Sequence, residues 1–285
     1  MGLKRPLSID EQIEKLKSHN LLIDESDDVK SFLSCVNYYR FTGYALEFRV
    51  DESNSDFING TTYQTIRTIY EFDKELRELI QKYLLEVEVY YRTQISNIVS
   101  LRKCRAFPHD QHYDLKNYYN RHSVAKIFQS FEKEIGYHKD ELVVKHHNEV
   151  YAHKMPLWVI VELISFSNLS KYYNSLYKSD KVAICESVGI DYKYLANWLY
   201  CMSVLRNKCA HGNRIYNIQF NPPAKMSKGF LQSNRDVSNQ SLVAYLYILK
   251  RMLPNNAARE QFTCALNSVY EKYRGLIDFK KIQKE

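Results

Sequence analysis

Four polar side chains that could act on a phosphate group lie together in one short segment. The sequence LRNKCAHGNRIYN (Leu205–Asn217) carries Arg206, Asn207, His211 and Arg214 directly after the apolar run YLANWLYCMSV. A histidine can accept and donate protons near neutral pH, and an arginine can hold a phosphate group through two hydrogen bonds. The segment therefore predicts a site for proton transfer beside a bound phosphate.

Such a set of groups suits the cleavage of RNA without a metal ion. The nucleophile in RNA is the neighbouring 2′-hydroxyl of the substrate, so the protein supplies neither Ser, Cys nor metal for that purpose. His211 would act as general acid and base, Arg206 would offset the charge of the phosphorane transition state, and Asn207 would orient the imidazole or bind a phosphate oxygen. The product would carry a 2′,3′-cyclic phosphate. The alternative is an ordinary helix end, in which His211 caps carbonyl groups and the arginines face solvent.

These side chains converge if one helix carries them. A helix over residues 191–214 would place Asn207, His211 and Arg214 on one stripe, because they step by four and three, with Arg206 about 100° from Asn207. The last step is conditional, because the glycine after the histidine can end a helix. The core face of this helix would be formed by the apolar residues that also step by three and four, namely Leu195, Leu199, Met202, Leu205 and Cys209.

The composition predicts an all-α protein. The chain has 285 residues, of which 45% are hydrophobic and 26% charged, so it can bury a substantial core. Only 8 Gly and 6 Pro are present, too few for the many turns of a β-sandwich or barrel. The net charge of +7 is compatible with a polyanionic partner such as RNA without proving one.

The apolar periodicity predicts the order of the helices. We expect a first helix over 7–19 that begins with a capping box, a turn-rich loop at 51–62 and a long helix over 63–103. Further helices are expected over 124–150, after Pro156, over 191–214, over 242–253 and over 257–273, with an irregular segment at 218–239. The predicted organisation is an N-terminal helical extension (1–60), a helical core with the Arg–His segment (61–217) and a C-terminal helical segment packed on the core (218–285).

No cofactor, metal or membrane partner is predicted. The six cysteines include no C-x-x-C pair, which predicts reduced, buried thiols. His146, His147 and His153 cannot share one helix face, so a metal site is not expected there. The N-terminus has no apolar leader, and the longest apolar run, LWVIVELISF, is interrupted by Glu162 and too short to span a bilayer. We expect a cytoplasmic protein.

Longer blocks of the sequence resemble a known family. The string RNKCAHGNRIYN is similar to the R-x4–6-H signature of the HEPN ribonucleases, with Arg206 and His211 on its two defining positions and Asn207 on the polar position after the arginine. The chain as a whole resembles the Abi-like abortive-infection proteins of the AbiD/AbiF group. Ser167 departs from that pattern, which usually has glycine there. The matching blocks, in family order, are LSIDEQIEKLKSHNLLI, VNYYRFTGYALEFR, TTYQTIRTIYEFDKELRELI, VEVYYRTQI, PLWVIVELISFSNLSKYY and NWLYCMSVLRNKCAHGNRIYN.

This resemblance implies a HEPN-type helical bundle and a toxin-like endoribonuclease that acts in phage defence. It implies that two HEPN units face each other across one cleft, so a chain with one motif would have to form a homodimer. Some relatives resemble toxins that are restrained by a small structured RNA, which suggests such an antitoxin here. The alternative function is a HEPN module that holds a structured RNA or a protein partner without cutting it.

Other residues are candidates for supporting roles. Glu88 and Arg92 have the i, i+4 spacing of an ordinary helix ion pair, and the family pattern carries both, so they could also orient Arg206 or His211. Arg214 would assist in binding RNA. Tyr39 and Arg40, in NYYRFTGY, have the mixture of aromatic and basic groups that contacts single-stranded RNA. For these two, packing of the N-terminal helices on the core is the competing interpretation.

Overall fold

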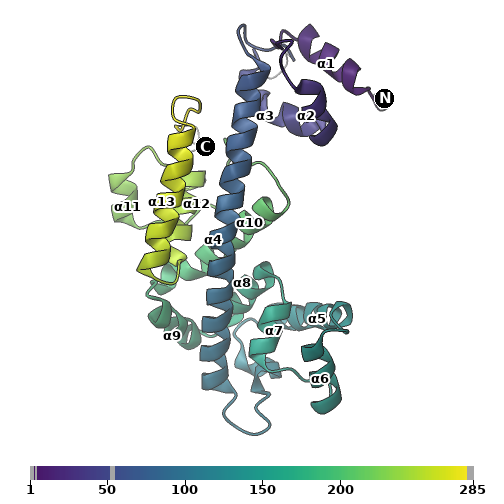
Figure 1. The fold of residues 1–285 in the computed structure, drawn as a ribbon. Helices are drawn as coiled ribbons and strands as arrows, with labels where there is room; N and C mark the ends of the chain where they lie inside the picture. Colours follow the sequence, from purple (N-terminus) through teal and green to yellow (C-terminus); the bar gives the residue numbers. More distant parts are fainter. Residues whose placement is uncertain (1–2, 4, 52–54, 281–285) are drawn as a thin grey trace. The chain divides into compact units, whose positions relative to one another are not determined.

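The structure, a computed structural model, describes residues 3, 5–51 and 55–280, and its regular elements are helical (Figure 1). Two isolated β-bridges, Leu22 with Thr62 and Arg49 with Phe57, are the only extended pairings in this part of the chain. The predicted all-α class is confirmed. The helices are α1 (Ile9–Ser18), α2 (Val29–Cys35), α3 (Tyr38–Tyr44), η1 (Leu46–Phe48), α4 (Tyr63–Lys103), η2 (Gln111–Tyr113), η3 (Leu115–Asn117), α5 (Arg121–Tyr137), α6 (Leu142–Val150), α7 (Leu157–Leu163), α8 (Phe166–Ser175), α9 (Lys178–Val188), α10 (Tyr192–Ala210), α11 (Lys228–Ser233), α12 (Leu242–Met252) and α13 (Asn256–Lys272).

The chain divides into two compact units, each with its own internal packing. The N-terminal unit comprises residues up to 78 together with 265–279, and the central unit comprises residues 79–264. Helices α4 and α13 contribute residues to both units. The three segments expected from the sequence, 1–60, 61–217 and 218–285, have boundaries that differ from those of these two units. That division of the chain stays a prediction.

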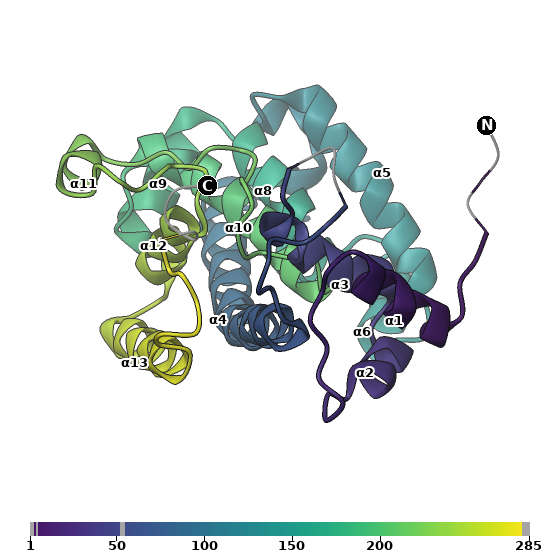
Figure 2. The ribbon, with the colours of Figure 1, turned by 90° about the horizontal axis from the view of Figure 1, so that it is seen from above.

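The N-terminal unit begins with the predicted capping box and is built around aromatic rings. The Ser8 hydroxyl accepts from the Glu11 N–H at 3.2 Å, while the Glu11 carboxylate accepts from the Ser8 N–H at 2.8 Å. Two orphan donors at the start of α1 are thereby satisfied. Phe32 on α2 lies edge-on to Phe41 on α3 and to Tyr63 on α4, with ring centroids 5.9 and 6.0 Å apart. Figure 2 shows α1, α2 and α3 as one group.

The central unit is organised around α10. This helix packs against α8, α9 and α12, and α5 packs against α7 and α8 (Figure 1). The predicted core stripe of α10 is confirmed, because these side chains are buried: Leu195, Leu199, Met202, Leu205 and Cys209. Helix α10 is therefore packed against three other helices of the central unit.

Two helices predicted as continuous are interrupted, for local reasons. The helix expected over 124–150 is interrupted between α5 and α6, where Glu141 has extended backbone angles (φ −71°, ψ 137°). The helix after Pro156 is interrupted between α7 and α8, where Ile164 is extended (φ −79°, ψ 151°). Apolar spacing persists across both breaks, so periodicity alone does not reveal them. Helix α9 and the short α11 within 218–239 were not predicted either.

No helix of the described residues is both long enough and apolar enough to cross a bilayer. All six cysteines are free thiols, but they are not uniformly buried as predicted. Cys35 and Cys264 are exposed, and Cys104 is half-buried.

A buried imidazole, His112, joins the loop after α4 to the start of α7. Its Nε2 donates to the carbonyl of Met155 at 2.9 Å, because that oxygen can only accept. Its Nδ1 is then left to accept from the Cys104 thiol, 3.3 Å away. Burial of the ring lowers the pKa of His112 below its usual value, partly opposed by the bond to Met155. His112 is therefore neutral in the folded protein at neutral pH.

We predict that His112 makes the central unit less stable in acid. Above the unfolded pKa, near 6.5, the imidazole is neutral in both states and no stability is lost. As the pH falls from there towards the lower folded pKa, the unfolded state binds the proton first and the free energy of unfolding decreases. Thermal unfolding between pH 7.5 and 5 should show a smaller fall in Tm for His112→Gln than for the wild type. Equal pH slopes for the two proteins would contradict the assignment.

Candidate active site at the end of helix α10

Helix α10 ends in a left-handed glycine turn. The last helical residue is Ala210, and Gly212 has a φ of +62°. The N–H groups of Gly212 and Asn213 bond to the carbonyls of Cys209 and Lys208 at 3.0 and 2.8 Å. This pair of bonds closes many helices that have glycine just past the cap, since glycine adopts positive φ without strain.

The turn fixes where the predicted proton-transfer residue lies. His211 is the cap residue (φ −89°, ψ 6°), its N–H bonds to the carbonyl of Asn207 at 3.1 Å, and its side chain is exposed. The expectation that the helix continues to Arg214 is wrong, because the glycine turn stops it. Arg214 lies beyond the turn and is half-buried, so it does not share a helical stripe with Asn207 and His211.

Arg206 is anchored by a carboxylate from another helix. Its Nε lies 3.4 Å from Oε2 of Glu88, which belongs to α4 and is 5% exposed. Its Nη1 approaches Oδ1 of the neighbouring Asn207 at 3.5 Å. The Arg206 side chain remains 42% exposed. The guanidinium is thus held by Glu88 on its Nε side, while a large part of the side chain stays exposed to solvent.

Glu88 is shared with a second arginine on its own helix. Arg92, 7% exposed, forms an ion pair with Glu88 through Nη2. Nη1 of Arg92 donates to the carbonyl of Ile164 at 2.8 Å. A chain of contacts therefore runs from the break between α7 and α8, through Arg92 and Glu88 on α4, to Arg206 on α10. The sequence identified all three charged residues but could not show that they touch.

The charges of this cluster do not balance. One buried carboxylate, Glu88, faces the two guanidinium groups of Arg92 and Arg206, which leaves an excess positive charge. The excess sits on Arg206, because it is the more exposed of the two. A phosphate group approaching Arg206 would compensate that charge through a charge-assisted pair of hydrogen bonds.

Tyr39 and Arg40 belong to a different compact unit from these residues. Both are on α3, in the N-terminal unit, whereas Glu88, Arg206 and His211 belong to the central unit. Tyr39 is 85% exposed and so is not packed into a core, and Arg40 is exposed as well. Their predicted contact with RNA stays a prediction.

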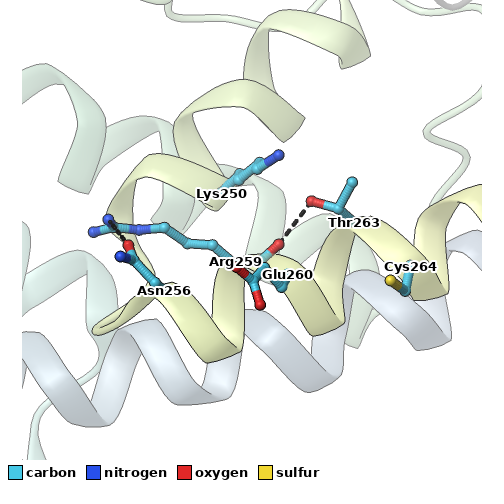
Figure 3. A pocket seen from close by; sticks show the side chains of 6 residues that line it. All are labelled: Lys250, Asn256, Arg259, Glu260, Thr263 and Cys264. Carbon is cyan, nitrogen blue, oxygen red and sulfur yellow. Dashed lines mark hydrogen bonds between the residues drawn. The ribbon is translucent and has the colours of Figure 1, made fainter.

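A pocket elsewhere in the central unit has a structural explanation. It has a volume of about 370 Å³ and is lined by residues of α12 and α13, and Figure 3 shows the Arg259 side chain extended towards Asn256. Arg259 donates to Oδ1 of Asn256 and to the carbonyl of Leu253, each at 3.1 Å. The arginine thus closes the turn between the two helices. Among the described residues, no three His, Cys, Asp or Glu side chains are grouped as metal ligands.

The fold and the site together define an all-α protein with an arginine and a histidine at the end of a core helix. A comparison with protein-family models matches residues 31–217 to the Abi-like protein family. The matched residues make up about two thirds of the chain. The chain belongs to this family, as the sequence blocks predicted. No curated protein and no solved structure matches it.

We predict that removal of the Glu88 carboxylate strongly destabilises the central unit. Glu88→Ala would leave the buried guanidinium of Arg92 without its counter-charge, which costs about 3–5 kcal/mol in comparable cases. Glu88→Gln keeps a hydrogen-bond acceptor and should cost less. Urea unfolding can be followed by tryptophan fluorescence, because both tryptophans, Trp158 and Trp198, belong to the central unit.

The matched control for this experiment is Glu86→Ala. Glu86 is on the same helix and half-buried, and no ion pair involves it among the described residues. Its removal should change the free energy of unfolding by about 0.5 kcal/mol or less. Equal destabilisation by Glu88→Ala and Glu86→Ala would show that the cluster does not hold the helices together.

Proposed function

We propose that the protein is a metal-independent endoribonuclease, the toxin of a bacterial abortive-infection or toxin–antitoxin system that acts in phage defence. One observation carries the proposal. A buried carboxylate contacts Arg206 at Nε while 42% of the arginine side chain stays exposed, five residues before an exposed histidine at the same helix end. Membership of the Abi-like family supports the biological role.

The reaction begins when the 2′-hydroxyl of the substrate attacks the adjacent phosphorus. His211 takes the proton from this hydroxyl as the new bond between 2′-oxygen and phosphorus forms. The bond from phosphorus to the 5′-oxygen breaks, and that oxygen leaves with a proton from an imidazolium. The products carry a 2′,3′-cyclic phosphate and a free 5′-hydroxyl. No metal-bound water takes part in these steps.

Arg206 stabilises the charge that builds up on the phosphate oxygens. Its planar guanidinium can give two parallel hydrogen bonds to neighbouring oxygens, and the Glu88 contact fixes its orientation beforehand. Asn207 already accepts from Arg206, so its amide N–H groups can donate to a phosphate oxygen. Arg214, past the glycine turn, adds positive charge for the flanking nucleotide.

A second copy of the chain would complete the site. The reaction needs a base and an acid, and two copies would supply one His211 each. Leu85 and Val89, one helix turn apart on the stretch of α4 that carries Glu88, are 62% and 50% exposed. Two neighbouring apolar side chains on this surface support a homodimer interface there.

A small structured RNA would hold the toxin inactive. The net charge of +7 and the relationship to the Abi-like family support this partner. A protein that holds RNA without cutting it is the alternative function, and the cleavage experiment distinguishes the two.

We predict that the purified protein, freed of bound nucleic acid, cleaves RNA in the presence of EDTA. His211→Ala should lower the rate by about 10²- to 10⁴-fold because the proton-transfer group is lost. Arg206→Ala should lower it by about 10²- to 10³-fold because the transition-state charge is less stabilised. The ends of the products can be identified by mass spectrometry.

The control variant is His122→Ala, which removes an exposed histidine of α5 and should keep the full rate. A strict need for a divalent metal, or products with 3′-hydroxyl ends, would refute the mechanism. If RNA binds tightly but is cleaved neither by the wild type nor by the variants, the alternative function, a protein that holds RNA without cutting it, is favoured.

A further inference from the structure

A second region of the central unit has the chemistry of an RNA-binding surface. A cavity of about 950 Å³ lies beside the first turns of α10, against the segment 222–228. Three lysines line it, Lys193, Lys225 and Lys228, and no Asp or Glu is among its lining residues. Lys193 pairs with Asp191 at its edge, at 3.1 Å. In the described part of the chain, no carboxylate forms an ion pair with Lys225 or Lys228.

The wall that carries Lys225 is fixed to α10 by three hydrogen bonds. Nδ2 of Asn197 donates to the carbonyl of Pro223 at 3.0 Å, and Oδ1 of Asn197 accepts from the Lys225 N–H at 2.7 Å. Nε1 of Trp198 donates to the Lys225 carbonyl at 2.7 Å. Both backbone groups of Lys225 are thus held while its side chain is exposed. The backbone from which the Lys225 side chain extends is therefore fixed before any ligand arrives.

One exposed side of α10 connects this cavity to the candidate active site. Lys193, Tyr200 and Asn207 recur every seven residues, which is about two helix turns, and His211 follows four residues later. All four side chains are exposed. Tyr200, between the cavity and the active site, is 48% exposed. The distance along the helix from Lys193 to His211 is about 27 Å at 1.5 Å per residue.

We propose that a single strand of RNA lies along this side of α10. Its phosphates enter the cavity lined by Lys193, Lys225 and Lys228, one base stacks on Tyr200, and the strand continues to His211. Lysines that follow a backbone and an aromatic ring that takes a base are the two elements of sequence-tolerant single-strand binding. The direction towards His211 rests on the proposed function, whereas binding at the lysines and Tyr200 does not.

Binding can be measured without turnover in the His211→Ala background. Fluorescence anisotropy with a labelled single-stranded RNA gives Kd across a range of salt concentrations. Adding Lys225→Gln with Lys228→Gln should weaken binding and reduce the slope of log K against log salt by about 1.4, since each phosphate contact to a single strand contributes about 0.7. The matched control replaces Lys133 and Lys139, two exposed lysines at 133–139, by Gln and should leave that slope unchanged.

Tyr200 is tested separately because its contribution does not depend on charge. Tyr200→Ser should weaken binding about 5- to 150-fold at every salt concentration, whereas Tyr200→Phe keeps the ring and the affinity. In the active protein, Tyr200→Ser and the Lys225→Gln/Lys228→Gln double variant should lower kcat/KM for a long RNA, whereas Tyr200→Phe should not. They should leave a dinucleotide substrate unaffected, because it is too short to reach Tyr200.

The outcomes separate this inference from the proposed cleavage. Unchanged affinity and slope in the Lys225/Lys228 variant, or failure of the wild-type surface to bind single-stranded RNA, would overturn it. Equal competition by polyglutamate at equal charge would also overturn it, because the site would then take any polyanion. If the lysine and Tyr200 variants lose RNA binding and the wild-type protein never cuts RNA, the proposed RNA-binding surface is supported. The proposed endoribonuclease activity is then refuted.

Discussion

The sharing of one buried carboxylate between two arginines is the interaction on which the candidate site depends. Glu88 meets Arg92 within α4 and Arg206 across the interface with α10. Two guanidinium groups next to one another would repel without the carboxylate between them, and burying Glu88 or Arg92 without the other would be costly. The carboxylate therefore does two things at once. It permits the helices to approach, and it sets the orientation of the one arginine that reaches solvent.

The break between α7 and α8 is part of the same arrangement. In one continuous helix the carbonyl of Ile164 would accept from the Asn168 N–H. Instead the hydroxyl of Ser165 accepts from that N–H at 3.2 Å, and the carbonyl of Ile164 is left to accept from Arg92 at 2.8 Å. The helix cap thus supplies the acceptor that satisfies the buried end of the cluster.

Sequence reasoning succeeded where local rules decide the structure and fell short where contacts between distant residues do. The capping box at Ser8 and the bounds of α4 follow from local pattern, because a long apolar periodicity with charged intervening positions has no competing solution. The contact of Glu88 with Arg206 joins residues more than a hundred positions apart, so spacing cannot reveal it. The anchoring of the Lys225 backbone was not predicted for the same reason, since its hydrogen-bond partners Asn197 and Trp198 belong to helix α10.

The glycine turn after α10 separates two kinds of sequence change. A residue inserted or deleted beyond Gly212 alters the loop but leaves the cap where it is. A residue inserted or deleted within α10, between the core stripe and His211, would rotate the imidazole by about 100° and shift it by about 1.5 Å along the axis. In this chain the number of residues between Leu205 and His211 therefore sets where the imidazole lies, whereas the length of the loop after the turn does not.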